Sequence, residues 1–264
     1  MLDLQHISKT FNPGTVNAKT ALRDLSLTLH EGDFVTVIGG NGAGKSTMLN
    51  AVAGSFSVDT GRIMIDGTDV THLPEHKRAA FIGRVFQDPM MGTAPTMQIE
   101  ENLALAARRG QRRGLKWGVT NAEREEYHEK LKMLGLGLED RMTAKVGLLS
   151  GGQRQALTLL MAAMQKPKLL LLDEHTAALD PRTAAKVLEL SDRIVEVNHL
   201  TTLMITHNMK DAIAHGNRLI MMDAGHIVLD ISGEEKKKLT VTDLLTLFSK
   251  ASGTEANDDK LLLS

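Results

Sequence analysis

The chain has 264 residues, of which 42% are hydrophobic, so it can bury a large core in one or two domains. Its 31 Lys and Arg residues nearly balance 32 Asp and Glu residues, and it has only six Phe, one Tyr and one Trp, which argues against a nucleic-acid-binding platform. There is no Cys, which excludes disulfides, thiolate metal sites and Cys nucleophiles and is typical of a reducing compartment. The N-terminus lacks the apolar core of a signal peptide, and no apolar run is long enough to span a bilayer. We therefore expect a cytosolic protein that reaches a membrane only through a partner.

The first 78 residues predict strands around a glycine-rich loop. Apolar residues alternate over 22–29, and a β-branched run over 34–38 follows a turn at 31–33. That run ends in the glycine-rich stretch GGNGAGKST, after which apolar residues recur at helical spacing over 48–53. Residues 61–70 predict a short hairpin that turns at Asp66-Gly67.

The pattern changes twice in the rest of the chain. Charged, helix-forming segments between about residues 88 and 150 predict an inserted helical subdomain. Beyond it we expect a helix over 153–164, a buried strand over 169–172, a helix after Pro181 and a strand over 202–205. This alternation indicates an α/β fold with a mostly parallel sheet covered by helices on both faces. A hairpin over 218–231 and an amphipathic helix through Leu244, Leu245 and Phe248 complete the expected elements.

Residues 39–46 satisfy the pattern G-x-x-x-x-G-K-[ST] between a strand and a helix, which is the context that a phosphate-binding loop requires. The glycines allow backbone amides to turn towards phosphate oxygens, and the following helix adds its positive dipole end. Lys45 would offer its charge to the outer phosphates, and Ser46 would ligate Mg²⁺. The three glycines of this interpretation are Gly39, Gly42 and Gly44.

The buried run LLLLDE supplies two carboxylates. Asp173, at the expected strand end, can hold the Mg²⁺ shell through water, and Glu174 can polarise an attacking water molecule. The alternative interpretation of the pair, as an acidic helix cap after a strand, is the less favoured one. His207 follows another apolar strand that would end at the same sheet edge, although a lone His is more often a solvated or core residue.

The stretch LSGGQRQ precedes an apolar helical pattern without bulky side chains. Its Ser150, Gly151 and Gly152 would leave the helix N-terminus open to a second anion. Because an inserted helical region separates this stretch from Lys45, we infer that it binds the γ-phosphate held by another copy of the chain, in a head-to-tail dimer. A Ser cap with a Gly turn would explain the helix start but not the Gln-Arg-Gln that follows.

These motifs, in this order over about residues 1–230, resemble the ATP-binding cassette, the nucleotide-binding subunit of ABC transporters. The resemblance implies a P-loop NTPase with an ABC-type core, an N-terminal antiparallel β subdomain and the helical subdomain at 88–150. It places the ATP-binding domain at residues 1–232 and leaves a short helix and tail at 233–264. By resemblance alone, Phe11 stacks on adenine, Gln87 contacts the γ-phosphate and Mg²⁺, and Asp180 belongs to the D-loop. His207 becomes the switch histidine, and the nucleotide-contacting set also includes Asn41, Ala43, Thr47 and Gln153.

Two departures from the family pattern affect loop stiffness rather than catalytic groups: Gly40 replaces the commoner Pro or Ser, and His175 replaces the usual Pro. Phe11 stands where Tyr is frequent and keeps the aromatic face.

The resemblance implies ATP hydrolysis with Mg²⁺, in which Glu174, His207 and Lys45 are catalytic. Expected partners are a second copy, membrane permease subunits and, for an importer, a solute-binding protein, with the chain at the cytoplasmic face of the cell membrane and no nucleic acid bound. The segment 96–118 resembles cassettes for uptake of amino acids or similar solutes, whereas residues 20–54 also resemble export or lipoprotein-release cassettes. A soluble, non-transport ATPase is a further alternative, although the chain lacks the tandem cassette or long coiled coil typical of that class.

A basic stretch over 108–116, followed by Trp117, has two interpretations. It can contact the membrane subunit or anionic headgroups, or it can be a solvated helix face. The stretch contains Arg108, Arg109, Arg112, Arg113 and Lys116.

Overall fold

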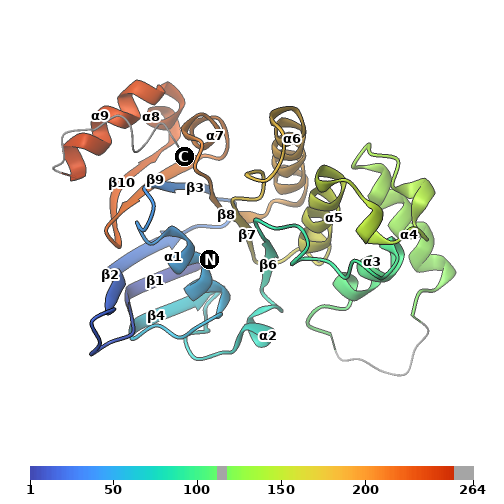
Figure 1. Cartoon of the computed structure of the whole chain (residues 1–264), viewed down its shortest axis with the longest axis horizontal. Helices are drawn as coiled ribbons and strands as arrows, with labels where there is room; N and C mark the ends of the chain where they lie inside the picture. The colour runs from blue at the N-terminus through green and yellow to red at the C-terminus, as the bar shows by residue number, and fades with distance from the viewer. Residues whose placement is uncertain (112–117, 253–264) are drawn as a thin grey trace. The chain divides into compact units, whose positions relative to one another are not determined.

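The computed structural model describes residues 1–111 and 118–252 (Figure 1). The chain divides into two compact units: unit 1 comprises Met1–Arg78 and the chain from Leu200 on, and unit 2 comprises Ala79–His199. Each unit contains part of the predicted α/β pattern. The predicted domain bounds, with a helical subdomain at 88–150 inside a domain of residues 1–232, stay a prediction.

Unit 1 contains a four-stranded antiparallel sheet in the order β2-β1-β4-β5. Its strands are β1 (Leu2–Phe11), β2 (Lys19–Leu29), β4 (Thr60–Ile65) and β5 (Thr68–Asp69). Leu25, Leu27 and Leu29 of the predicted pattern form a buried face, because successive strand side chains point to opposite faces. Leu22 is also buried, beyond an irregularity in the strand pairing near Asp24, which has a left-handed conformation. The predicted turn is also present, with Asp66 and Gly67 in left-handed conformations between β4 and β5.

A second group of strands in unit 1 carries the glycine-rich loop. Strand β3 (Phe34–Gly39) pairs in parallel with β8 (Thr201–Ile205) and β9 (Arg218–Asp223), and β10 (His226–Ser232) is antiparallel to β9. Helix α1 (Lys45–Ala53) starts directly after the loop. The short helix α2 (Glu75–Arg78) ends the first segment of the unit.

In the part of unit 1 that the structure describes, three helices follow β8: α7 (Met209–Ala214), α8 (Gly233–Lys238) and α9 (Val241–Ser252). Helix α9 matches the predicted amphipathic helix, and Leu244 packs against Ile38, Ala212, Leu219 and Met221. Helix α8 was not predicted, because its sequence GEEKKK has no apolar stripe. It is anchored by the buried Lys236, whose ammonium donates to the carbonyl oxygens of His215 and Gly216.

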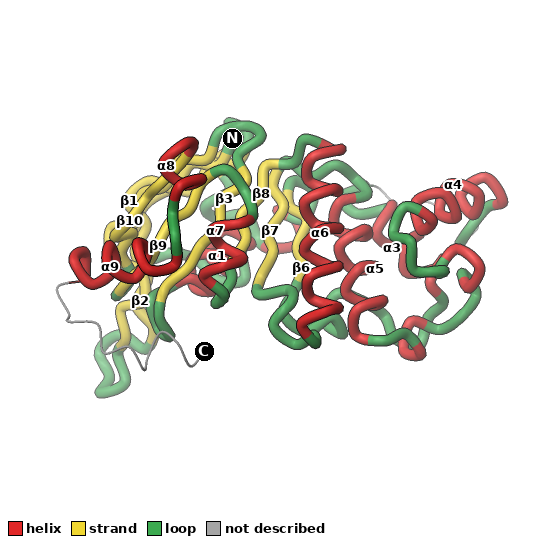
Figure 2. The backbone as a smooth tube through the Cα atoms, turned by 90° about the horizontal axis from the view of Figure 1, so that it is seen from above, coloured by secondary structure: helices red, strands yellow, loops and turns green. Residues whose placement is uncertain are grey.

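Unit 2 combines two parallel strands with helices. Strand β6 (Ile82–Val85) pairs with β7 (Leu169–Asp173). The predicted helical region contains α3 (Ile99–Ala107), α4 (Asn121–Lys132) and the short 3-10 turns η1 (Glu139–Arg141) and η2 (Val146–Leu148). Helices α5 (Gly151–Ala163) and α6 (Pro181–Asn198) pack side by side (Figure 2).

Within residues 1–111 and 118–252, none of the helices has the length and apolar character needed to traverse a lipid bilayer.

Candidate functional site

The glycine-rich loop of unit 1 has a backbone that only glycine adopts easily. Gly39, Gly42 and Gly44 all have positive φ values, of 150°, 83° and 104°. At Gly39 a side chain is also excluded by contact, because its Cβ would collide with the carbonyl oxygen of Met222 on β9. The loop is therefore fixed between β3 and α1 with its amides arranged around a turn, which suits an anion.

Lys45 lies at the first position of α1 and is 5% exposed. Its Nζ donates to the carbonyl oxygens of Gly39 and Gly40, at 2.7 and 3.2 Å, so the ammonium is held over the loop. The surrounding positions differ in access to solvent. Asn41, Gly42 and Ser46 are exposed, Thr47 is half-buried, and Ala43 and Gly44 are buried.

His207 lies beside the same loop. It follows β8, and the amide of Thr206 donates to the carbonyl oxygen of Val37 on β3, which brings the two strand ends together. His207, Gly39 and Gly40 line one small cavity together with Phe248 of α9. The expected proximity of His207 to the phosphate loop is therefore present in unit 1.

Phe11, at the end of β1, is half-buried and has an aromatic partner that the sequence did not indicate. Its ring meets Phe56 edge to face, with centroids 5.2 Å apart and planes 82° apart. The ammonium of Lys9 is 5.7 Å from the Phe11 centroid and 5.6 Å from that of Phe56. Phe56 could not be found from a motif, because the pair joins the end of a strand to the segment after α1.

The two carboxylates of LLLLDE follow the predicted strand in unit 2. Asp173 is the last residue of β7, and Glu174 has a φ of 46°, a left-handed conformation that is uncommon for glutamate. Asp173 also has a partner that no motif indicated: Nη2 of Arg84, on β6, is 3.3 Å from its Oδ2. His175, where the family usually has Pro, is buried, and its Nε2 shares a 2.9 Å hydrogen bond with Oγ of Ser191 on α6.

Ser150 is the N-cap of α5. Its Oγ accepts from the amide of Gln153, and the Gln153 side chain accepts from the Ser150 amide, both at 3.2 Å. This capping box involves the amides of Ser150 and Gln153 and leaves those of Gly151 and Gly152 to other acceptors. Gly152 has a packing role as well, because a Cβ there would collide with Cγ2 of Thr183 on α6.

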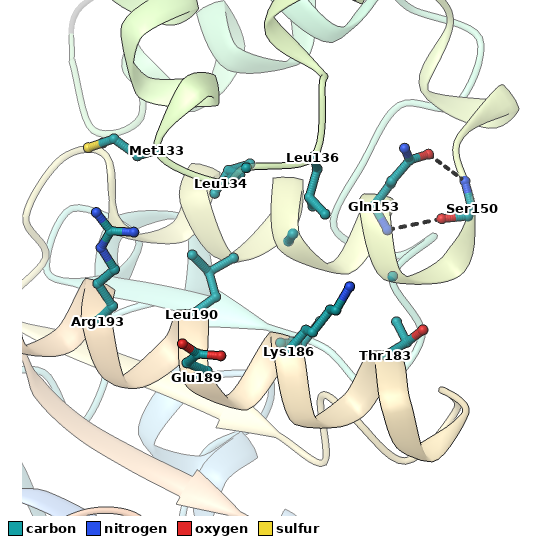
Figure 3. A pocket seen from close by; sticks show the side chains of 14 residues that line it. Met133, Leu134, Leu136, Ser150, Gln153, Thr183, Lys186, Glu189, Leu190 and Arg193 are labelled. Carbon is teal, nitrogen blue, oxygen red and sulfur yellow. Dashed lines mark hydrogen bonds between the residues drawn. The ribbon is translucent and has the colours of Figure 1, made fainter.

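A groove of about 500 Å³ lies beside this helix start (Figure 3). Ser150 and Gln153 line one side, opposite Thr183 and Lys186 of α6. The apolar residues of the groove include Met133, Leu134, Leu136, Ala156, Val187 and Leu190.

Gln87 and Asp180 are also in unit 2. Gln87 is exposed in the loop after β6, and the neighbouring carbonyl oxygen of Phe86 accepts from Nε2 of Gln155 at 3.2 Å. Asp180 is the N-cap of α6, and hydrogen bonds from Thr183 hold the pKa of its carboxyl below the usual 3.8. The sequence had assigned Asp180 to the D-loop, and the structure adds this capping role.

The basic stretch is only partly described. Arg108 donates to Glu123 at 2.8 Å, and Arg109 donates to the carbonyl oxygen of Ala162 at 2.9 Å, so both have partners within unit 2. The remaining residues of the stretch, Arg112, Arg113 and Lys116, and Trp117 after it, lie outside the described residues.

The chain matches the family model described as "ABC transporter" over residues 22–177, which is more than half its length. It is 45% identical to the tyrosine transport ATP-binding protein of Clostridioides difficile, over 95% of this chain and 100% of that protein. It is 36% identical to a methionine import ATP-binding protein of Enterococcus faecalis, over 86% of this chain but only 64% of that longer protein.

Solved structures similar to this chain are also ATP-binding cassettes. A dimeric ATP-binding cassette in a post-hydrolysis state, bound to ADP and Pi, is 30% identical and has a TM-score of 0.75, covering 88% of this chain and 98% of that one. An ATP-binding cassette in its ADP conformation is 27% identical and has a TM-score of 0.76, covering 94% and 98%. The chain therefore belongs to the ATP-binding cassette family. It is an ABC-type ATPase, the ATP-binding subunit of an ABC transporter.

Proposed function

We propose that this chain drives the uptake of an amino acid, with tyrosine as the first candidate. The observation that carries the proposal is the 45% identity to a tyrosine transport ATP-binding protein along that protein's whole length. A second relative is named for methionine import, which also favours uptake over export or lipoprotein release. Spermidine and putrescine, named in another relative at 32% identity, are the competing class of solute.

In this proposal unit 1 binds the nucleotide. The amides around Gly42 and Gly44 and the ammonium of Lys45 bind the β- and γ-phosphates, and the half-buried ring of Phe11 stacks on adenine. His207 contacts the γ-phosphate, which is supported by its position beside Gly39 and Gly40.

The oxygen donors of the chain suit a hard cation. The hydroxyl of Ser46, the carboxylate of Asp173 and the side-chain amide oxygen of Gln87 are the ligand types that Mg²⁺ prefers, and the exposed Ser46 is open to it. When bound, Mg²⁺ would neutralise charge on the phosphates. Glu174 would orient the attacking water and accept its proton.

The reaction centre would be completed by a second copy of the chain. The amides of Gly151 and Gly152, together with Ser150 and Gln153, would face the γ-phosphate held by the partner, and Asp180 would lie at the dimer interface. This is supported by the open helix start and by the dimeric relative with ADP and Pi bound.

Membrane permease subunits are the proposed partners at the cytoplasmic face of the membrane, with a solute-binding protein on the other side. Support comes from apolar side chains close to Gln87 along the chain: Met90 is 40% and Met91 69% exposed. Leu148, the last residue of η2, is 72% exposed. Exposed apolar residues at neighbouring loops are typical of a protein contact, so movement of the Gln87 loop could pass to the permease.

The Glu174→Gln variant tests the hydrolytic site. We expect ATP hydrolysis to fall about 100-fold or more, because the amide cannot accept a proton, while ATP still binds and holds a dimer. Phosphate release measures the rate of ATP hydrolysis. Light scattering after size exclusion in the presence of ATP measures dimer formation. Glu125→Gln, an exposed change on α4, is the control. Normal hydrolysis in Glu174→Gln would contradict the assignment of the base.

The solute is tested separately, with the chain and its permease reconstituted in proteoliposomes. The solute-binding protein loaded with tyrosine should stimulate ATP hydrolysis more than the same protein supplied with methionine or spermidine. Equal stimulation by all three, or a preference for spermidine, would overturn the choice of tyrosine without affecting the ATPase assignment.

A further inference from the structure

Arg84 and Asp173 form an ion pair that the proposed mechanism has not used. The two strands β6 and β7 are parallel, with Arg84 opposite Leu171, so the long Arg84 side chain can reach forward to the end of β7. Nη2 of Arg84 is 3.3 Å from Oδ2 of Asp173, and the two side chains are only 13% and 16% exposed. At this burial the attraction between opposite charges is much less screened than on an open surface.

The guanidinium is held from a second direction. It lies over the ring of Phe86, 4.5 Å from the centroid, in a cation–π contact. Phe86 is in turn bound to α5, because its carbonyl oxygen accepts from Gln155. The next residue along the chain is Gln87. Arg84 therefore connects the carboxylate at the end of β7 to the loop that carries Gln87.

This arrangement matters for any cation that approaches Asp173. A carboxylate already paired with a guanidinium is partly neutralised, and a metal-bound water must compete with Arg84 for the same oxygens. Mg²⁺ gives up its own hydration reluctantly, so it cannot displace the guanidinium without cost.

We propose that Arg84 is a positioning residue that sets the Mg²⁺ concentration which this ATPase needs for nucleotide binding. Its ion pair with Asp173 must loosen when Mg²⁺ and nucleotide bind. Its contact with Phe86 carries that change to the Gln87 loop. The inference rests on the proposed role of Asp173 as a metal-holding carboxylate. The partially buried pair makes the site selective for the metal–nucleotide complex, which brings two favourable contacts at once, over Mg²⁺ alone.

The test is the Mg²⁺ dependence of nucleotide binding, measured on the full chain by fluorescence of a labelled ATP analogue, with no hydrolysis involved. In Arg84→Met the Mg²⁺ concentration for half-maximal enhancement of binding should fall roughly 3- to 10-fold, as expected for loss of a competing ion pair. Arg84→Lys keeps a cation there and should stay closer to the wild type. An unchanged or higher Mg²⁺ requirement in Arg84→Met would overturn the proposal.

Two controls separate the possible failures. Arg124→Met removes another arginine–carboxylate pair of unit 2, with Glu100, and should leave the Mg²⁺ dependence unaltered. Asp173→Asn should weaken the effect of Mg²⁺ on binding. If Asp173→Asn has no effect, the proposed metal role of Asp173 is wrong; if it has one and Arg84→Met has none, only the role of Arg84 is wrong. Should Arg84→Met fail to fold, Arg84→Gln, which is neutral but can still donate, replaces it with the same expectation.

Discussion

At the scale of single residues, Arg78 illustrates how one buried cation can secure the segment behind the phosphate loop. It is 1% exposed and donates to four carbonyl oxygens. Two of these belong to Ala51 and Val52, near the C-terminus of α1, where a helix leaves carbonyl groups without intrahelical partners. The others belong to Thr71 and Leu73, so Arg78 ties α1 to the segment that follows β5.

Arg78→Met should therefore lower the free energy of unfolding by about 3 kcal/mol or more, because several buried carbonyl oxygens lose a charged donor at once. Denaturant unfolding followed by circular dichroism measures the change. Arg141→Met, at an exposed position in η1, should stay within about 0.5 kcal/mol of the wild type. A similar small change for Arg78→Met would mean that water replaces the guanidinium without penalty.

The sequence predicted residues whose role depends on a local pattern, and it missed those whose role depends on distant partners. Lys45, Ser150 and Asp173 were singled out because strand, glycine and helix signals surround them, and their roles at the nucleotide stay predictions. Arg78 bonds only to backbone oxygens in the contacts described above, and a backbone oxygen has no sequence signature. Arg84 meets a carboxylate at the end of a different strand, so its pairing appears only once β6 and β7 are aligned.

At the scale of elements, α9 contributes to the core of unit 1 rather than lying loose after the last strand. Leu244 is fully buried against residues of β3, α7 and β9. Leu244→Ala should cost about 2–5 kcal/mol of unfolding free energy, since it removes buried methyl groups and leaves a cavity. Leu105→Ala on α3, where the side chain is 41% exposed, is the matched control and should cost much less. Equal, small losses in both would show that α9 unfolds independently of the core.

Periodicity predicted the elements that bury an apolar face, and it failed where polar groups define an element. The strands over 22–29 and 34–38 and the helix at 241–252 follow from alternation and helical spacing. Helix α8 has no such face, and hydrogen bonds help to fix it: the buried ammonium of Lys236 donates to the carbonyl oxygen of Gly216, and the amide of Gly233 donates to that of Asn217. The start of α5 at Gly151 rather than at residue 153 reflects the cap formed by Ser150, which extends the helix into the glycines.

At the scale of the whole molecule, several carboxylates make the free energy of unfolding depend on pH. Their pKa values are lowered, chiefly by hydrogen bonds: Lys9 acts on Asp59, and Arg124 acts on Glu100. A carboxylate whose folded pKa is depressed stabilises the fold above its unfolded pKa, and that contribution disappears as pH falls through the folded pKa. The group with lowered values comprises Asp59, Asp69, Glu100, Asp180 and Asp243.

We therefore expect the unfolding free energy to fall as pH drops below the ordinary carboxyl pKa values of 3.8 and 4.5. Among the described residues, Asp211 acts in the opposite sense, because burial raises its pKa, whereas the five carboxyl groups named above have lowered pKa values. Urea unfolding between pH 7 and pH 3 measures the trend. Glu100→Gln should be less stable at pH 7 and lose less on acidification, and a slope as steep as that of the wild type would exclude Glu100 as a contributor.

The close approach of α5 and α6 affects how the residues at the start of α5 should be interpreted in sequences of related proteins. Where Thr183 is kept, a Cβ at position 152 would collide with its Cγ2, so packing would favour a glycine there even in a subunit that had stopped binding nucleotide. Position 150 is different, because Asp or Asn could cap the same helix equally well. When a new sequence is examined for lost activity, a serine at position 150 is therefore stronger evidence that nucleotide binding is retained than a glycine at position 152.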